Sequence, residues 1–226
     1  MSRIAIIAAL PGELKPLVGR NGDWRRSEPN LWTGALSGHE AIAIAGGIGA
    51  VAAERAVSTA LSHGRPDALI SYGWAGALTC ALKPPAAYAI SEVIDHLSGE
   101  RFATCSPQGT RLVTLDHVAR PAEKRALAQA HQAVLVDMEA AAIARIAAEN
   151  DIPFYCFKGI SDAYTDNLPD FGLFISQTGE LRTAAFLAHA ALRPAYWPAL
   201  IRLGRNSSVA ASNLARSLSK TLPSSL

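Results

Sequence analysis

Cysteine is scarce in this sequence: the 226 residues include only Cys80, Cys105 and Cys156, and these lie far apart. An odd number of cysteines at such spacings matches neither a zinc-binding pattern nor a disulfide framework. This usage is typical of a reducing compartment, so we expect a cytoplasmic location.

Long hydrophobic runs are also absent. Half of the residues are hydrophobic, but no run approaches the roughly 20 residues that span a bilayer. The opening "MSRIAIIAALPGEL" has a short apolar part that runs directly into Glu13, so we interpret it as a first strand and not as a signal peptide. The length suits one large domain.

Acidic residues are missing from one end of the chain. Residues 193–226 carry a charge of +5 with no acid, whereas the whole chain carries +2, which leaves about −3 for residues 1–192. Because the basic charge is confined to this tail, we expect no nucleic-acid partner. We therefore divide the chain into a main domain, 1–192, and a basic amphipathic C-terminal helix and tail, 193–226.

Metal-ligand patterns are absent as well. The six histidines show no ligand spacing, and the acids in "VDMEA" have no histidine or third acid nearby in the sequence. We expect neither a metal nor an organic cofactor.

Short β-branched runs alternate with alanine-rich stretches along the chain. This alternation predicts an α/β fold whose mostly parallel central sheet is covered by helices on both faces, with ligands bound at the carboxyl ends of the strands. Strands are expected at 3–10, 41–47, 67–73, 87–95, 111–115, 133–137 and 154–160, and helices at 12–18, 50–63, 122–131, 138–150, 178–192 and 196–218.

Two acids interrupt the apolar run "AVLVDMEAAAIARIA". Asp137 has a structural explanation, because an acid near a helix N-terminus caps it and interacts favourably with its dipole. Glu139 shares one helical face with Ile143 and Ile146, so it points along the buried stripe. A buried carboxylate is costly without donors or a ligand, and we predict that Glu139 is functional.

Two further acids follow other strands. Asp162 ends the strand in "FYCFKGISDAYTD", and Glu13 follows the first strand. Taken singly, Asp162 would be read as a turn residue and Glu13 as a surface charge in the first turn of a helix. Acids at the ends of three parallel strands converge at one edge of the sheet, and we predict a site there.

The motifs "VDMEAAAIA" and "FKGISDAYTD" resemble the nucleoside phosphorylase superfamily, and in style most nearly its methylthioadenosine/S-adenosylhomocysteine nucleosidases. The segments "IAIIAALPGEL", "GGIGAVAAE" and "SYGWAGAL" are similar to landmarks of that family in the same order, over residues 3–166. The resemblance implies a homo-oligomeric enzyme, by expectation a homodimer, that breaks the N-glycosidic bond of a purine nucleoside.

The resemblance also implies residue roles. Glu13 would orient or deprotonate the attacking water, Glu139 would accept hydrogen bonds from the ribose, and Asp162 would act on purine N7. Asp162 would have to be protonated near neutral pH, which requires burial or neighbouring acids to raise its pKa above the free value of about 3.9. Further substrate contacts are expected from Met138, Ser161, Trp74, Gly76 and Val118, the last at the position where relatives place an aromatic residue against adenine.

The nucleophile is open between water and phosphate. Phosphate needs cationic or hydroxyl donors, and "SYGWAGAL" contains no arginine, although Gly46, Gly47 and Gly49 could offer backbone donors. We favour water and keep a phosphate-dependent phosphorylase as the alternative. A non-catalytic nucleoside-binding protein is a third hypothesis, because Trp74 stands where nucleosidases usually have a small polar residue.

The substrate is expected to be a 5′-modified adenosine. The segment between "WAGAL" and "VDMEA" is shorter than in typical methylthioadenosine nucleosidases, which would open the 5′ side. The tail "WPALIRLGRNS" resembles hopanoid-associated members, thought to remove adenine from the lipid-linked nucleoside adenosylhopane in hopanoid biosynthesis. Its apolar stripe could lie on the inner face of an anionic membrane, or pack on its own domain or a second subunit; the stripe comprises Ala211, Leu214, Ala215 and Leu218.

Overall fold

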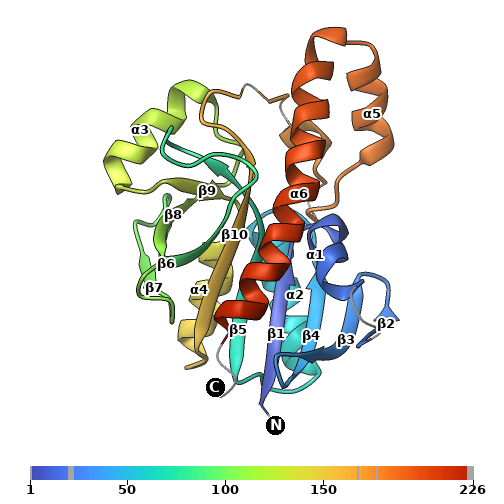
Figure 1. Ribbon diagram of the computed structural model, residues 1–226, viewed down its shortest axis with the longest axis vertical. Coiled ribbons are helices and arrows are strands. Elements are labelled where there is room, and N and C mark those ends of the chain that lie inside the picture. The colour runs from blue at the N-terminus through green and yellow to red at the C-terminus, as the bar shows by residue number, and fades with distance from the viewer. Residues whose placement is uncertain (1, 20–22, 167, 170, 177, 223–226) are drawn as a thin grey trace.

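The computed structural model describes residues 2–19, 23–166, 168–169, 171–176 and 178–222. A single ten-stranded sheet runs through the molecule, with helices on both faces (Figure 1). The predicted α/β class is therefore confirmed. The sheet is more mixed than expected, because antiparallel pairs flank its parallel centre.

The strands follow the β-branched runs of the sequence. All seven predicted strands are present, and three more occur. The residues of two of them, 24–28 and 101–103, are mainly exposed, which hid these strands from a hydrophobic pattern. The third, 31–36, is mostly apolar but only partly buried, and it was missed. The bounds are β1 Arg3–Ala8, β2 Trp24–Glu28, β3 Leu31–Leu36, β4 His39–Ala45, β5 Ala68–Ala77, β6 Ala87–Asp95, β7 Arg101–Ala103, β8 Thr110–Thr114, β9 Leu135–Asp137 and β10 Phe154–Asp162.

The sheet is parallel at its centre, and on one side its strands close into a barrel. Strands β4, β1, β5 and β10 lie side by side in parallel. β3 and β2 extend the sheet beyond β4 as an antiparallel edge. On the other side β10, β6, β8 and β9 return to β5, so five strands close into a small barrel. The carboxyl ends of β1, β5, β9 and β10 thereby meet in one region.

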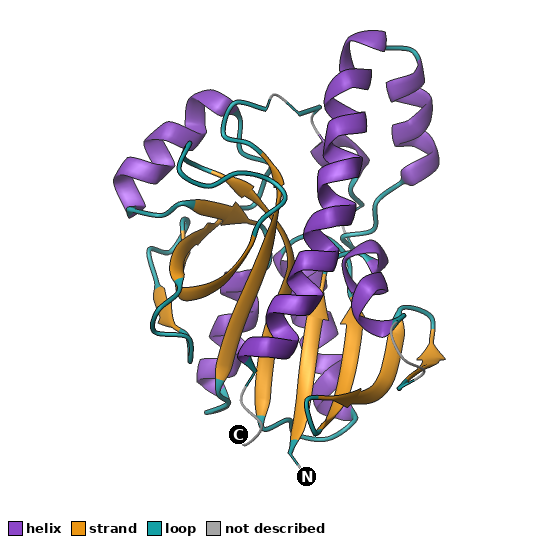
Figure 2. Cartoon of the chain, in the orientation of Figure 1, coloured by secondary structure: helices purple, strands orange, loops and turns teal. Residues whose placement is uncertain are grey.

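The six helices also match the predicted ranges to within a few residues. α2 and α4 cover one face of the sheet, and α1 and α6 cover the other (Figure 2). Small alanines on α2 and α4 let these helices approach the sheet closely. The bounds are α1 Pro11–Val18, α2 Ala50–Ser62, α3 Pro121–His131, α4 Ala140–Glu149, α5 Thr183–Ala191 and α6 Trp197–Thr221, with 3-10 turns η1 Phe171–Phe174 and η2 Pro194–Tyr196.

The last helix has two unlike halves. The apolar stripe Ala211, Leu214, Ala215 and Leu218 is buried against the sheet, so that half packs on its own domain. The first half of α6 projects together with α5 and η2 beyond the sheet (Figure 1). Within the described residues no helix is both long and apolar enough to cross a membrane.

Candidate active site

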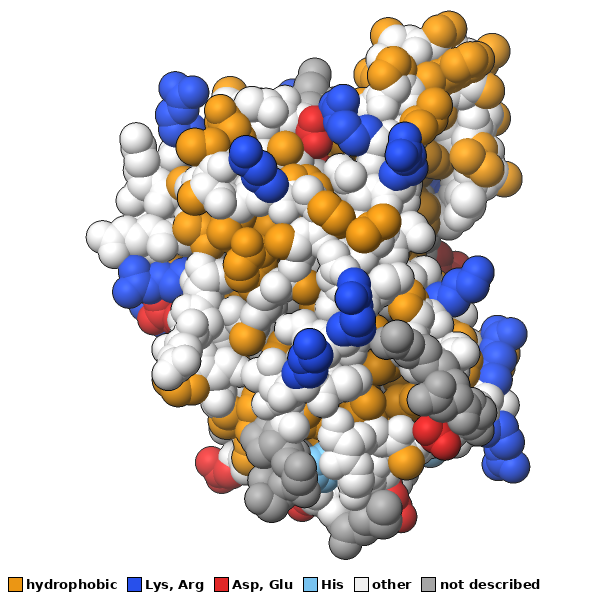
Figure 3. Space-filling model, viewed as in Figure 1, with side chains coloured by type: hydrophobic (Ala, Val, Ile, Leu, Met, Phe, Trp, Pro, Cys, Tyr) orange, Lys and Arg blue, Asp and Glu red, His pale blue; other side chains and the backbone are white. Residues whose placement is uncertain are grey.

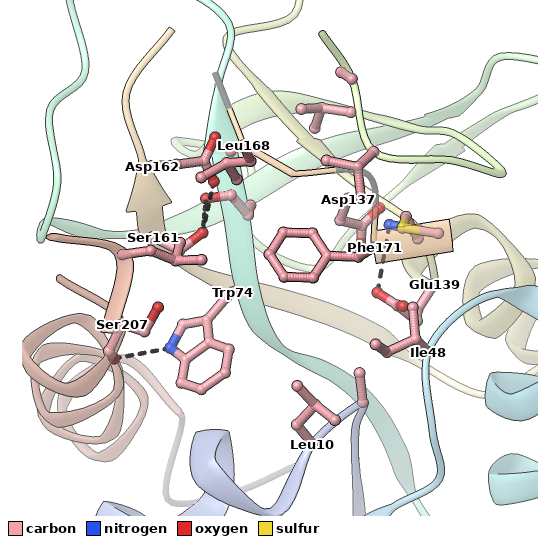
Figure 4. Close-up of a pocket in the computed structure, with 18 of the residues that line it drawn as sticks. Leu10, Ile48, Trp74, Asp137, Glu139, Ser161, Asp162, Leu168, Phe171 and Ser207 are labelled. Carbon is pink, nitrogen blue, oxygen red and sulfur yellow. Dashed lines mark hydrogen bonds between the residues drawn. The ribbon is translucent and has the colours of Figure 1, made fainter. Parts of the chain in front are cut away.

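One cavity lies where the carboxyl ends of β1, β5, β9 and β10 meet (Figure 4). β1, β5 and β10 are parallel and end at the same edge of the sheet. β9, which precedes Met138 and Glu139, instead runs antiparallel to β5 and reaches the same cavity through the closed side of the sheet. All eight lie on the cavity wall: Glu13, Trp74, Gly76, Val118, Met138, Glu139, Ser161 and Asp162.

Glu13 is held in place by α1 itself. Pro11 starts the helix, and the Glu13 carboxylate turns back to accept the N–H of Leu10 at 2.8 Å, as in a capping box. The same oxygen accepts from Ala9 at 2.8 Å, and the other accepts from Trp74 at 2.7 Å. Burial raises the pKa of Glu13, while these N–H groups oppose the rise. The Glu13 carboxylate is therefore buried and held in a fixed orientation by three N–H groups.

Two glycines of β5 make room for the acids. A Cβ on Gly73 would lie 2.5 Å from a Glu13 oxygen, and one on Gly76 would lie 3.0 Å from an Asp162 oxygen. Any other residue would therefore push these carboxylates out of place.

Glu139 lies at the start of α4, not inside it. The helix begins one residue later than Glu139, so the side chain is free to point into the cavity instead of along the apolar stripe. It accepts the N–H of Gly49 at 2.8 Å and that of Met138 at 3.3 Å. Burial, and then the nearby Asp137, raise the pKa of Glu139 to about 8.

The raised pKa of Glu139 has a consequence for stability. The folded chain binds this proton more tightly than the unfolded chain, so stability falls as pH rises from about 4.5 to about 8. We expect Glu139→Gln to raise the free energy of unfolding by roughly 2 kcal/mol at the upper end of this window and much less at the lower end. Thermal unfolding of both proteins at the two pH values measures this, with exposed Glu149→Gln as the control. A difference that does not change with pH would contradict the idea.

Asp137 and Lys158 form a buried pair beside Glu139. The Lys158 ammonium lies 2.8 Å from the Asp137 carboxylate, and both side chains are almost fully buried. Asp137 also accepts from the hydroxyl of Thr114 at 2.7 Å and from the N–H of Ala140 at 3.0 Å. The capping role predicted for Asp137 is thus present. Lys158 was missed, although a lysine inside the apolar stretch "FYCFKGI" was a visible signal.

Asp162 is buried and lies next to a lysine. Lys124 of α3 donates to its Oδ2 at 2.6 Å, and the Ser161 hydroxyl donates to its Oδ1 at 2.7 Å. Each carboxylate oxygen therefore accepts one hydrogen bond from a neighbouring side chain. Of the two surroundings considered for Asp162, burial is present, whereas the charged group bonded to it is a lysine and not an acid. Nothing in "RPAEKRAL" distinguishes Lys124 from a surface lysine, so sequence reasoning missed it.

Trp74 forms part of the cavity wall and is hydrogen-bonded to α6. Its indole N–H donates to the Ser207 carbonyl at 2.9 Å (Figure 4). Its ring also lies against Gly12, where an added Cβ would come within 3.1 Å. The bulky residue thus fills space next to Glu13 that a small polar residue would leave open.

The glycine turn after β4 has no N–H left for an anion. The N–H groups of Gly46 and Gly47 bind the carbonyls of Ala8 and Ala9, each at 2.9 Å. The N–H of Ile48 binds a carbonyl of the segment before α5, and that of Gly49 binds Glu139. The backbone donors considered for phosphate are therefore all in use.

An apolar rim, which sequence reasoning also missed, completes the cavity. The Phe171 ring lies between the Asp162 end and the Glu139 end of the cavity (Figure 4). These residues carried no recognisable pattern because they come from the irregular segment after β10 and from α6. The rim comprises Leu168, Phe171, Ile175, Leu181 and Leu203. Among the described residues no group of three or more histidine, cysteine or acidic residues could hold a metal.

Solved structures share this fold at low identity. A 5′-methylthioadenosine/S-adenosylhomocysteine nucleosidase of Streptococcus pneumoniae, bound to a transition-state inhibitor, has a TM-score of 0.73 at 21% identity over 96% of each chain. A mutant Helicobacter pylori nucleosidase with 5′-methylthioadenosine in its active site has a TM-score of 0.74 at 16% identity over 97% of each chain. Futalosine hydrolase of H. pylori has a TM-score of 0.72 at 17% identity, over 96% of this chain and 95% of that chain.

The sequence itself matches a family model over most of its length. The model describes the phosphorylase superfamily, and it matches residues 3–117 and 97–193. The matched ranges contain every residue placed on the cavity wall except Leu203 and Ser207 of α6. The chain belongs to the phosphorylase superfamily.

Proposed function

We propose that this protein is a purine nucleosidase that uses water to release adenine from a 5′-modified adenosine. The observation that carries the proposal is the convergence of Glu13, Glu139 and Asp162 on one cavity. The fold shared with nucleosidases supports it.

The chemistry assigns one task to each acid. Breaking the C1′–N9 bond leaves positive charge on the ribose and negative charge on the departing purine. Glu139 beside the ribose stabilises the positive charge when it is ionised, and a proton delivered at Asp162 neutralises the negative charge on the purine. Glu13 takes the proton of the water that attacks C1′. Met138 and Val118 shape the sugar and base pockets, and Gly76 leaves space for the Asp162 carboxylate.

Three observations favour water over phosphate as the nucleophile. The N–H groups of residues 46–49 are already bonded. Glu13 places a carboxylate next to the expected attack position, where it would repel an anion when ionised. Within the described part of the chain the cationic side chains on the cavity wall are Lys124 and His117, and Lys124 is paired with Asp162.

Release of free base with and without phosphate tests the proposal. Methylthioadenosine, S-adenosylhomocysteine, inosine, futalosine and adenosylhopane are incubated with the protein, and the base and sugar products are separated by chromatography. We expect adenine and the free ribosyl product at equal rates in both conditions. Sugar 1-phosphate as the product would identify a phosphorylase instead, and binding without turnover would identify a non-catalytic nucleoside-binding protein.

The apolar rim suggests the class of 5′ substituent. Leu168, Phe171 and Leu203 offer no hydrogen-bonding side chain, so they suit an apolar group better than an amino-acid or sugar chain. We propose a lipid-linked nucleoside such as adenosylhopane as the specific substrate. The homodimer expected from the resemblance stays a prediction, as does the division of the chain at residue 192.

The projecting hairpin of α5, η2 and the first half of α6 supports contact with a membrane. Its described residues contain no acid after Glu180, and hydrophobic side chains gather over its end in the upper right of Figure 3. Apolar residues flanked by arginines suit an anionic lipid surface. A self-associating hairpin would instead bring like charges together. The exposed apolar residues of the hairpin are Leu187, Leu192, Trp197, Ile201 and Val209, and the arginines in it or next to it are Arg182, Arg193, Arg202 and Arg205.

Vesicle binding tests the hairpin. We expect the protein to float with phosphatidylglycerol vesicles and not with phosphatidylcholine vesicles, since arginines attract anionic lipid at about 1 kcal/mol each. Replacing Leu187, Leu192 and Ile201 by serine should reduce binding by at least about tenfold, because each buried leucine-sized side chain contributes roughly 1.5–3 kcal/mol. Leu97→Ser, at an equally exposed apolar position on the sheet side, is the matched control. Equal flotation of the triple variant would exclude the hairpin as the contact.

A further inference from the structure

Lys124 is the one buried basic residue on the cavity wall of the described chain. Its side chain is 2% exposed, although it belongs to the first turns of α3, whose other face meets solvent. The ammonium donates to Asp162 at 2.6 Å and to the Ala163 carbonyl at 3.0 Å. Burying a lysine is costly unless it is paired, so this position is maintained by its partner.

The number of transferable protons around Asp162 indicates a role for Lys124. The purine must receive a proton at N7 as the C1′–N9 bond breaks, and Asp162 accepts hydrogen bonds at both oxygens in the structure. Ser161 has a single hydroxyl proton, and its oxygen also lies 3.3 Å from the Ala75 carbonyl. The transferable proton of this cluster is therefore the one shared between the Lys124 ammonium and the Asp162 carboxylate.

We propose that Lys124 supplies, through Asp162, the proton that neutralises the departing purine, an inference that rests on the proposed nucleosidase function. One proton moves from Nζ of Lys124 to Asp162 and from Asp162 to N7, while the electron pair of the C1′–N9 bond moves onto the purine. Water adds to C1′ and gives its proton to Glu13. After the products leave, Glu13 returns a proton to solvent and Lys124 takes one up, so the cycle closes.

This arrangement differs from a protonated acid in its pH dependence. A carboxylic acid loses its proton as pH rises past neutrality, whereas an ion pair with lysine retains one proton to higher pH. The wild-type protein would therefore stay active where an isolated buried aspartic acid would already be ionised. Other titratable groups face the pair and remain in any Lys124 variant: Glu13, Asp137 and Glu139 on the wall, His117 at the rim, and Asp166 with Arg202 beside Ala163.

The test compares the pH profiles of adenine release for wild type, Lys124→Met and Lys124→Arg. Methionine keeps the length of the side chain without its charge, and arginine keeps the charge but holds its proton too tightly to give it up. We expect Lys124→Met to lose about 10²-fold in kcat/KM near pH 8, with the loss shrinking below about tenfold near pH 5, where solvent can supply the proton in place of the lysine. Lys124→Arg should recover no more than Lys124→Met near pH 8.

Three outcomes would overturn the inference. If kcat/KM of Lys124→Met falls by the same factor at every pH, Lys124 only stabilises the structure. If Lys124→Arg is fully active, a positive charge alone is sufficient. If kcat/KM of Lys124→Met does not fall near pH 8, Lys124 takes no part in the reaction. Melting temperatures and the exposed variant Lys83→Met control for folding. If the wild type itself releases no base, the proposed function fails, which is a separate result from an active wild type with a pH-independent loss in Lys124→Met.

Discussion

Replacing Glu13 by glutamine is expected to lower kcat for adenine release by roughly 10²–10⁴-fold, the range attributed to a positioned general base. Water is a poor nucleophile until its proton is taken, and Glu13 is the acid on the cavity wall whose carboxylate is oriented by three N–H groups. The wild-type rate should rise with pH through the raised pKa of Glu13, because the base must be ionised, and this acid limb should vanish in the variant.

The Glu13 variant needs a control for local structure. A glutamine amide cannot accept from both sides as the carboxylate does, so part of the loss could come from displaced backbone at Leu10 or Trp74. The proposed mechanism places adenine at the Asp162 end, so calorimetry should show adenine affinity within about threefold of wild type. Glu54→Gln, at an exposed position on α2, should change neither activity nor affinity. Retention of wild-type kcat in Glu13→Gln would remove this residue from the mechanism.

Replacing Lys158 by methionine is expected to destabilise the protein by about 3–5 kcal/mol, because removing one member of a buried pair leaves an uncompensated charge. The Lys158 and Asp137 side chains are 2% and 0% exposed, so water cannot replace the lost partner. For a chain of this size the melting temperature should fall by roughly 10 °C. Lys158 also lowers the pKa values of Glu13 and Glu139, so the acid limb of the activity profile should move to higher pH.

A double variant separates the charge from the packing. Adding Asp137→Asn to Lys158→Met removes the unpaired carboxylate, and we expect it to recover part of the lost stability at neutral pH. Lys220→Met, at an exposed position near the end of α6, should melt like the wild type. Equal melting temperatures for Lys158→Met and the wild type would show that the pair contributes nothing to stability.

Much of this protein was determined by the sequence alone. β-branched runs and alanine-rich stretches placed seven strands and six helices, because hydrophobic periodicity reflects burial directly. The alternation of strands and helices indicated parallel neighbours, so Glu13, Glu139 and Asp162 were expected at one edge of the sheet. The three acids do share one cavity, although β9, which precedes Glu139, runs antiparallel to β5. The motifs around "VDMEA" and "GISDAYTD" indicated the superfamily that the family match establishes.

Only the tertiary structure decided what surrounds these acids. In the sequence, Lys124 cannot be distinguished from a surface lysine of an amphipathic helix. Its pairing with Asp162 depends on where α3 lies against the end of β10. The use of the glycine-turn N–H groups likewise depends on Glu139 and on a segment about 130 residues farther along the chain. The local sequence pattern determines the periodicity of a helix or strand. Hydrogen-bond partners and the burial of charged groups arise from contacts between distant segments. In the proposed mechanism these contacts determine protonation and the choice of nucleophile.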